Sequence, residues 1–379
     1  MNKSTAVPAA VLSSALSGVA APATHFVIGV TDPITLGAFR FRLGPMRSEG
    51  GPSMLRVAFA GVFAARFEEP VRACLAIPCD AIVGEESGIV RRLPEVDVLV
   101  TMAFTREMGA SARRLKLVQV PGASLDRIDL SALPAGTWLA NAYGHEVGIA
   151  EYVIGAMVAL NRGLCRVDAR LRRGEWESQW AVSAPPPAPW PELAGKTLGI
   201  LGYGRIGQAV AQRARAFHME VLGIRRAVGR SAEDDLALLG GLDALDDVLR
   251  RSDYLVIALS LTDATRDLLG ERELRMMKPT AALINVARAE IVDEEALYRA
   301  LAQKTIAGAA LDVWYRYPTG AGPTLPSRHA FQELPNVLMT PHVSGWTEGM
   351  LEARTKLIAE NIHRTARGEP PVNLIPAPE

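Results

Sequence analysis

From Met54 onward, the chain alternates short apolar runs with longer stretches in which apolar residues recur at helical spacing. This alternation is typical of parallel sheets whose buried strands are covered by helices. Helices are expected between the strands, for example at Glu68–Leu75, Arg205–Phe217 and Glu294–Gln303. The predicted strands are Leu55–Ala60, Asp97–Thr101, Leu115–Val120, Thr197–Leu201, Glu220–Ile224, Tyr254–Leu259, Ala281–Val286, Gly308–Val313 and Val337–Met339.

Two long helical patterns organise the domains. The first, Glu146–Arg172, would run roughly 40 Å, which is enough to cross between domains; it places Ile149, Val153, Met157 and Leu160 on one face. The second, Thr347–Arg367, carries Met350, Leu351, Ile358 and Ile362, and we expect it to pack on the first domain. The stretch Trp180–Glu192 is rich in Pro and Trp and indicates a connector.

The predicted fold class is therefore α/β with two Rossmann-like domains. A substrate domain is built from both chain ends, residues 54–150 and 341–379, and a dinucleotide-binding domain, residues 151–340, is inserted between them. The second domain contains six predicted strands, from Thr197 to Met339, which is the number in a complete dinucleotide-binding sheet.

A glycine-rich loop, KTLGILGYGRIG, is the strongest single motif. Gly202, Gly204 and Gly207 stand in G-x-G-x-x-G spacing between a predicted strand and a predicted helix, as dinucleotide binding requires. The free N–H groups and partial positive charge of the helix N-terminus suit a diphosphate. We expect Tyr203, Arg205 and Ile206, which lie within the loop, to belong to the same site.

In residues 1–53 the apolar residues do not recur at a helical or strand spacing, and the segment is rich in Ala, Ser, Pro and Gly. We interpret them as a disordered leader. Two alternatives are a weak export signal after Lys3, interrupted by serines, and a true translation start at Met54.

Composition narrows the class of partner. Lys plus Arg and Asp plus Glu are equal at 41 each, so no basic surplus points to nucleic acid or to an anionic membrane. No apolar run reaches the roughly 18 residues of a membrane span. Cys74, Cys79 and Cys165 are odd in number and lack metal-ligand companions, which favours free thiols, a cytoplasmic location and no metal.

Four further segments, in order, resemble the D-isomer-specific 2-hydroxyacid dehydrogenases. They are GASLDRID at Gly122–Asp129, LINVARAEIVDEEAL at Leu283–Leu297, GAALDVW at Gly308–Trp314 and LPNVLMTPHVSG at Leu334–Gly345. The resemblance covers about Met54 to Pro371. It implies the split two-domain fold, a reaction in the cleft, a nicotinamide cofactor, a small 2-oxo or 2-hydroxy acid as substrate, and a homodimer formed through the cofactor domain.

The resemblance assigns roles to three residues. His342 matches the catalytic histidine, and an imidazole suits proton transfer near neutral pH. Arg288 matches the substrate arginine, whose planar fork can bind a carboxylate through two bonds. Asp312 matches a residue that contacts the nicotinamide carboxamide. The plainer alternatives are a strand cap for His342, an ion pair of Arg288 with Asp293 or Glu294, and a strand end for Asp312.

One position departs from the family. The third catalytic member, a Glu before a proline, is replaced here by Tyr317 before Pro318. A phenol can hydrogen-bond to imidazole but cannot raise its pKa as a carboxylate does, so we expect His342 to hold its proton less well.

Formate dehydrogenases of the same superfamily also lack the Glu, and DVWYRYP with PHVSG resembles their closing segments. Formate oxidation is therefore an alternative activity. Against it, their Asn before the corresponding helix is matched here by His145, which either touches substrate or only starts the helix. Trp346 either walls the pocket or belongs to the core. Met102 and Ala103 either hold a substrate carboxylate through backbone amides or form a plain loop.

The cofactor position after the second strand holds Arg225 and Arg226, with Arg230 and Ser231 nearby, where NAD-binding relatives place an acid. Arginines suit a 2′-phosphate, which favours NADP over NAD; a solvated basic turn with NAD bound is the alternative. We also assign Ser260 and Ala287 to the cofactor site. A further class, a dinucleotide-dependent binding protein like the C-terminal binding protein corepressors, stays open because the Glu is missing.

Overall fold

The computed structural model describes residues 54–182, 186–226 and 236–376. The predictions for the leader, and those for Arg230 and Ser231, lie outside these residues. Ser53–Glu379 is one compact unit that holds two sheets, and the α/β class with two Rossmann-like domains is confirmed.

The first sheet has the strand order β13-β5-β4-β3-β1-β2, and only β13 is antiparallel to its neighbour. Its strands are β1 (Leu55–Ala60), β2 (Cys79–Gly84), β3 (Val98–Thr101), β4 (Leu117–Gln119), β5 (Trp138–Ala140) and β13 (Leu374–Ile375). Side chains alternate between two cores, so that Val57 and Phe59 enter one and Ala58 and Ala60 the other. The pattern predicted β1, β3 and β4. It missed β2, an incompletely buried edge strand, and β5 and β13, which are very short.

The second sheet has the order β12-β11-β10-β9-β6-β7-β8, and all its pairs are parallel. Its strands are β6 (Thr197–Leu201), β7 (Glu220–Ile224), β8 (Leu238–Gly240), β9 (Tyr254–Ile257), β10 (Ala282–Asn285), β11 (Gly308–Leu311) and β12 (Val337–Met339). The six predicted strands are present, and the short edge strand β8 makes seven. From β6 the next strands, β7 and β8, are added on one side, and β9 to β12 are added on the other side. The strand order therefore switches between β6 and β9, and ligands bind at such a switch point in open α/β sheets.

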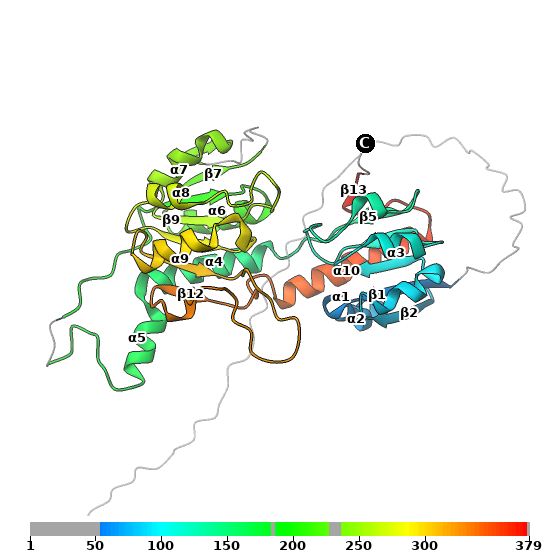
Figure 1. The fold of residues 1–379 in the computed structure, drawn as a ribbon, viewed down its shortest axis with the longest axis horizontal. Helices are drawn as coiled ribbons and strands as arrows, with labels where there is room; N and C mark the ends of the chain where they lie inside the picture. The colour runs from blue at the N-terminus through cyan, green and yellow to red at the C-terminus, as the bar shows by residue number, and fades with distance from the viewer. Residues whose placement is uncertain (1–53, 183–185, 227–235, 377–379) are drawn as a thin grey trace, which may run out of the picture. The chain divides into compact units, whose positions relative to one another are not determined.

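The last helix packs on the first sheet, as predicted. In α10 (Glu348–Ala366), Met350, Ile358 and Ile362 are buried in one core with residues of β1, β3 and β4. Figure 1 shows α10 beside α2 (Glu68–Cys74), with which it is in contact. Asn361 strengthens this attachment because its fully buried amide donates to Gln119 Oε1 of β4 at 2.7 Å.

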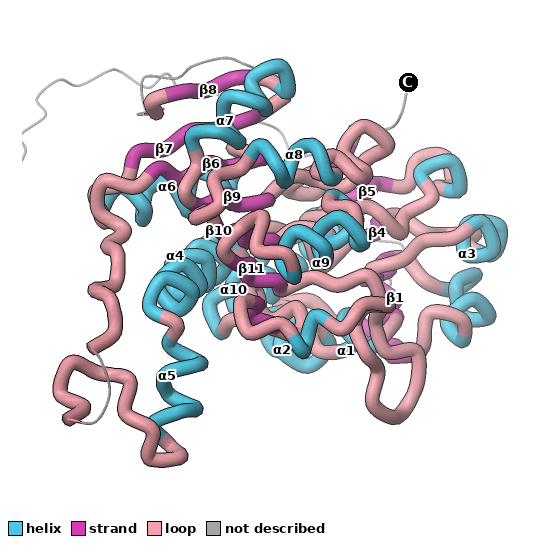
Figure 2. The backbone as a smooth tube through the Cα atoms, turned by 60° about the vertical axis from the view of Figure 1, so that its left-hand side comes forward, coloured by secondary structure: helices cyan, strands magenta, loops and turns pink. Residues whose placement is uncertain are grey.

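The prediction of one helix over Glu146–Arg172 is wrong. The structure has α4 (Glu146–Arg162) and α5 (Leu164–Leu171), which meet at an angle of 58°. Gly163 separates them and adopts the left-handed conformation with φ 55°, which glycine reaches without a steric penalty. The buried face of α4 packs against the second sheet, whereas no residue of α5 is buried, and Figure 2 shows α5 extending away from α4.

The remaining helices cover the sheets and connect their strands. They are α1 (Val62–Ala65), α3 (Arg106–Ser111), α6 (Arg205–Ala216), α7 (Leu245–Arg251), α8 (Glu271–Met276) and α9 (Glu294–Ala302), with short 3-10 turns at Gly88–Glu95, Leu130–Ala132, Leu242–Ala244, Ala289–Ile291 and Phe331–Glu333. Among the described residues, no single helix has the length and apolar character of a membrane span; α4 and α5 pass that test only as a bent pair.

Candidate active site

The glycine loop joins β6 to α6, and its three glycines differ in their surroundings. Gly202 has φ +102°, and a Cβ there would lie 2.5 Å from the carbonyl carbon and oxygen of Ala258. At Gly207 a Cβ would lie 2.5 Å from the Gly202 carbonyl oxygen, so only glycine lets α6 approach the strand. A Cβ at Gly204 would meet no described atom within 4 Å, so the loop is open at this position.

This loop fits the diphosphate of a dinucleotide. Helix α6 has no side-chain cap bond, and the position of Gly204 at its start is open, so the N–H groups of its first turn need another acceptor, which an anion can supply. The amides of Gly202 and Tyr203 both donate to Ile224 O of β7, which fixes the turn. The Arg205 guanidinium lies 4.2 Å from the centre of the Tyr143 ring, and Ile206 is half-buried at the start of the helix.

The other predicted cofactor residues lie after the carboxyl ends of β7, β9 and β10. Arg225 follows β7 directly and is half-buried, its amide donates to Gly240 O, and Arg226 beside it is exposed. Ser260 is exposed after β9, and its carbonyl accepts the Thr265 hydroxyl. The Ala287 amide donates to Asn285 Oδ1. All four positions lie at the edge of the sheet where the switch point is found.

Asp312 holds the loop that follows β12. Its carboxylate is fully buried and accepts bonds from Thr340 Oγ1 at 2.6 Å, from Val343 N at 2.9 Å and from Ser344 N at 2.8 Å. Such bonds to a charged acceptor are stronger than neutral ones. Asp312 therefore holds the Thr340 side chain before His342 and the backbone of Val343 and Ser344 after it.

His342 has the left-handed backbone conformation, with φ 58°. Its Nδ1 lies 2.8 Å from the Tyr317 hydroxyl. The surrounding protein removes water from part of the ring, and this desolvation lowers the pKa of His342; the Asp312 carboxylate opposes the shift and the Arg288 charge adds to it. The imidazole is therefore biased toward its neutral form.

Tyr317 occupies the position where the sequence lacks the expected Glu. Burial raises the pKa of Tyr317, so its hydroxyl keeps its proton at neutral pH. The hydroxyl oxygen also accepts the Trp314 amide at 3.4 Å, and Trp314 Nε1 donates to Thr340 O at 2.8 Å. The phenol can thus donate to His342 Nδ1 or accept from it, and it brings no charge to the imidazole.

Arg288 follows β10 and forms an ion pair with Asp126, which is 162 positions earlier in the sequence. Its Nε donates to Asp126 Oδ2 at 2.8 Å, and Nη1 donates to the Ala287 carbonyl at 2.7 Å. The predicted alternative of a pair with Asp293 or Glu294 is not what the structure contains: Asp293 caps α9, and Glu294 accepts from Ser327 and pairs with Arg328. Asp126 orients the guanidinium, and the remaining N–H groups of the fork are available to a carboxylate.

His145 precedes α4 and contacts α10. Its Nδ1 lies 2.9 Å from Arg354 Nη2. Burial lowers the pKa of His145 to about 4; Arg354 and, more weakly, Arg288 act in the same direction, while Glu146 opposes them. The Arg288 charge therefore acts on both His145 and His342.

The last three predicted residues lie elsewhere in the first domain. The Ala103 amide donates to Thr101 Oγ1 at 3.2 Å, and Met102 packs near Gly122. Trp346 is 40% exposed, so the interpretation as a core residue is wrong. Its ring lies 5.8 Å from the Phe63 ring in a tilted arrangement, and the Arg66 guanidinium lies 5.4 Å from its centre. Trp346 also lines a hollow of about 500 Å³ between α2 and α10.

Three residues that hydrogen-bond to the predicted site residues were not themselves predicted: Asp126, Thr340 and Arg354. Asp126 lies inside GASLDRID, but its partner is 162 positions away. On α10, apolar residues at a spacing of four, Met350, Ile358 and Ile362, lie on the buried face, and Arg354 occupies the remaining position of that series. A charged residue on an apolar helix face could therefore have been noticed in the sequence.

Comparison with known proteins gives the same result at family level. The family description "D-isomer specific 2-hydroxyacid dehydrogenase, NAD binding domain" matches residues 154–344. A glyoxylate reductase of Thermococcus gammatolerans is 35% identical over 292 residues, which cover 76% of this chain and 85% of that protein.

Solved structures of the same fold include two with different chemistry. An acyclic imino acid reductase, Bsp5, in complex with NADPH and D-Arg, superposes with a TM-score of 0.70 at 26% identity and covers 85% of this chain and 100% of its own. A Granulicella formate dehydrogenase gives a TM-score of 0.67 at 27% identity, covering 79% of this chain and 80% of its own.

The family match spans the glycine loop, Arg288, Asp312 and His342, and the relatives cover most of the chain. The chain therefore belongs to the D-isomer specific 2-hydroxyacid dehydrogenase family and is an oxidoreductase that uses a nicotinamide dinucleotide.

Proposed function

We propose that this enzyme interconverts a 2-oxo acid and a D-2-hydroxy acid, with His342 as the acid and base and Arg288 as the substrate anchor. One observation carries the proposal: β10, β11 and β12 are parallel neighbours, so Arg288 after β10 and His342 after β12 bring a cation and a proton donor to the same edge of the second sheet. Reduction of a 2-oxo acid needs these two groups, because a cation holds the carboxylate and polarises the ketone while an acid protonates the new alkoxide.

Each group has a defined task. The nicotinamide, when bound, supplies the hydride. The open loop at Gly202, Gly204 and Gly207 would hold the diphosphate, and Asp312 remains a proposed contact of the nicotinamide carboxamide. His342 gives its Nε2 proton to the alkoxide oxygen while Nδ1 stays bonded to Tyr317. In the oxidative direction the same nitrogen takes the proton back.

A panel of substrates tests this function. Purified full-length protein is mixed with NADPH or NADH at pH 6 to 7, and glyoxylate, hydroxypyruvate, pyruvate and phenylpyruvate are supplied in turn. We expect oxidation of the cofactor by at least one acid. The His342→Ala variant should lose about 10²- to 10⁴-fold in kcat, which is the usual contribution of a positioned acid.

The same panel separates the alternatives. Formate with NAD or NADP is assayed in parallel, and its oxidation without turnover of any 2-oxo acid would replace the proposed reaction by formate chemistry. Tight dinucleotide binding with no turnover in either assay would favour a non-catalytic, corepressor-like role. Turnover unaffected by His342→Ala would contradict the role of His342.

Tyr317 sets a testable pH dependence. Reduction uses protonated His342, so it declines as pH rises through the pKa of His342, and desolvation places that decline at lower pH. A carboxylate beside Nδ1 favours the protonated ring, so Tyr317→Glu should move the decline in kcat/KM upward by about one pH unit or more. Tyr317→Phe, which adds no charge, is the control. Coincident profiles for Tyr317→Glu and wild type would refute the prediction.

The arginines after β7 support a preference for NADP over NAD. Arg225 and Arg226 stand where a 2′-phosphate would need cations, and a hydrogen bond to a charged group is worth roughly 1.5–3 kcal/mol. The Arg225→Asp variant should therefore raise KM for NADPH at least about tenfold and spare KM for NADH. Arg250→Asp, at an exposed position of α7, should change neither. Equal efficiency with both cofactors, unchanged by Arg225→Asp, would contradict the assignment.

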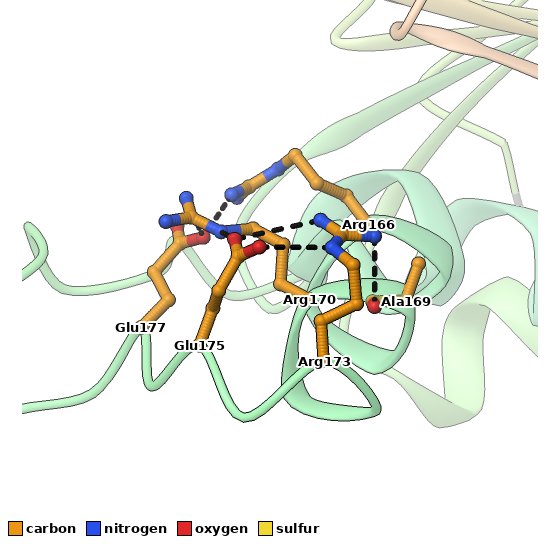
Figure 3. Close-up of polar contacts among 6 residues, drawn as sticks. All are labelled: Arg166, Ala169, Arg170, Arg173, Glu175 and Glu177. Carbon is orange, nitrogen blue, oxygen red and sulfur yellow. Dashed lines mark hydrogen bonds and ion pairs between the residues drawn. The ribbon is translucent and has the colours of Figure 1, made fainter.

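We also propose a homodimer, with α5 and the segment after it as contact surface. Arg166, Arg170 and Arg173 on and after α5 pair with Glu175 and Glu177, which folds that segment back on the helix (Figure 3). The segment leaves Trp176 61% exposed and Trp180 78% exposed. Large exposed aromatic residues are enriched at protein interfaces, and these two side chains gain burial if a second copy covers them.

Light scattering coupled to size exclusion tests the dimer. The wild-type chain should elute with twice the monomer mass. The double variant Trp176→Glu with Trp180→Glu should be a monomer at the same concentration, because it brings charge into the contact surface. Leu242→Glu, an exposed residue elsewhere on the second domain, is the control. A monomeric wild type, or a double variant that stays dimeric, would disprove the contact.

A further inference from the structure

A buried cation lies directly behind His145. Arg354 in α10 is only 6% exposed. Its Nη2 lies 2.9 Å from His145 Nδ1, and its Nε donates to the Tyr143 carbonyl at 3.1 Å. Burying a guanidinium is costly unless it forms hydrogen bonds. These two hydrogen bonds therefore fix the position of the Arg354 guanidinium.

The chemistry of the two groups fixes the tautomer of His145. A guanidinium has donors only, so Nδ1 must accept the bond with its lone pair. The neutral ring then carries its single proton on Nε2. Because the two nitrogens of an imidazole point away from each other, Nε2 is directed away from Arg354.

His145 also lies against the loop that carries His342. A Cβ added to Gly345 would stand 3.4 Å from the His145 Cβ, so the loop backbone packs on this residue. Gly345 lies three positions after His342. The charge of Arg288 reaches both histidines. His145 therefore packs on the loop that carries His342, and the Arg288 charge favours the neutral form of both rings.

We propose that Arg354 is a positioning residue that holds His145 as an uncharged Nε2–H donor to an oxygen of the 2-oxo acid bound by Arg288. This inference rests on the proposed function, since it names a further group for the same substrate. An uncharged donor beside a guanidinium adds a directed bond to the substrate carboxylate or ketone without a second positive charge. It also selects substrates with a second acceptor oxygen near the one held by Arg288.

The charged groups around His145 agree with a neutral ring. Arg354 comes from α10, Arg288 from the loop after β10 and Glu146 from α4; the Glu146 Oε2 atom accepts the Gly144 amide at 2.9 Å. Burial and the two arginines lower the pKa of His145 to about 4, against the opposing effect of Glu146. His145 then stays neutral across the pH range in which His342 exchanges its proton, so the two histidines have separate tasks.

The first experiment uses the wild-type chain and needs no substrate. Ring nitrogens of ¹⁵N-labelled histidine are recorded by NMR from pH 5 to 8, and His145 is assigned from the spectrum of His145→Gln. We expect one neutral tautomer with the proton on Nε2 and no titration in this range. Titration near the ordinary value of about 6.5, or a proton on Nδ1, would overturn the inference.

Variants of Arg354 give a second readout. Arg354→Met should mix the tautomers of His145 and raise KM for glyoxylate about tenfold or more, with a smaller change in kcat. Arg354→Lys, which keeps a donor, should restore part of KM and of the tautomer. Lys356→Met, two positions on and exposed on the same helix, is the matched control. A changed tautomer with unchanged KM would remove the positioning role.

Oxalate, an unreactive dicarboxylate, separates the two proposals. Its binding in the presence of NADPH is measured by calorimetry for wild type and Arg354→Met. A wild type that binds oxalate, more weakly in the variant, but reduces no 2-oxo acid contradicts the proposed function and leaves the inference standing. A wild type that reduces glyoxylate, with oxalate binding and KM unchanged in Arg354→Met, contradicts only the inference.

Discussion

The buried carboxylate of Asp312 is the constraint on which the reactive end of the site depends. His342 has a left-handed backbone, which costs an L residue roughly 1–2 kcal/mol. Bonds from Val343 N and Ser344 N to Asp312 oppose that cost and fix the residues that follow His342. With the backbone fixed, Nδ1 of His342 lies 2.8 Å from the Tyr317 hydroxyl. The second sheet thus positions the His342 imidazole through one carboxylate at the end of β11.

Much of the fold could be predicted because it depends on local patterns. Buried parallel strands are continuous apolar runs, and β1, β6, β7 and β12 begin and end at the predicted residues. Elements that depend on their neighbours were missed: β8 and β13 are short edge strands, and β13 exists only because β5 lies beside it. The break at Gly163 could not be predicted either, because the apolar spacing continues past it. One residue with a positive φ nevertheless separates α4 from α5.

The site divides in the same way. Arg288, Asp312 and His342 stand in motifs, so their positions could be predicted, and Tyr317 stood out as a departure. Their partners could not: Asp126 is 162 positions from Arg288, and Arg354 is 209 positions from His145. Such pairs follow from how loops and helices pack. The missing Glu also gains a physical meaning only in the structure, where the Tyr317 hydroxyl keeps the bond to Nδ1 and supplies no charge.

In the proposed reaction, His342 protonates a ketone whose acid group is held by Arg288, giving a D-2-hydroxy acid. The configuration of the product tests it most directly, because Arg288 and His342 would hold the carboxylate and the ketone oxygen and so decide which face of the ketone receives the hydride. Pyruvate is reduced with NADPH or NADH by the full chain, and the lactate is resolved by chiral chromatography. Wild type should give D-lactate, and His342→Ala should give none above background. L-lactate, or equal D-lactate from the variant, would contradict it.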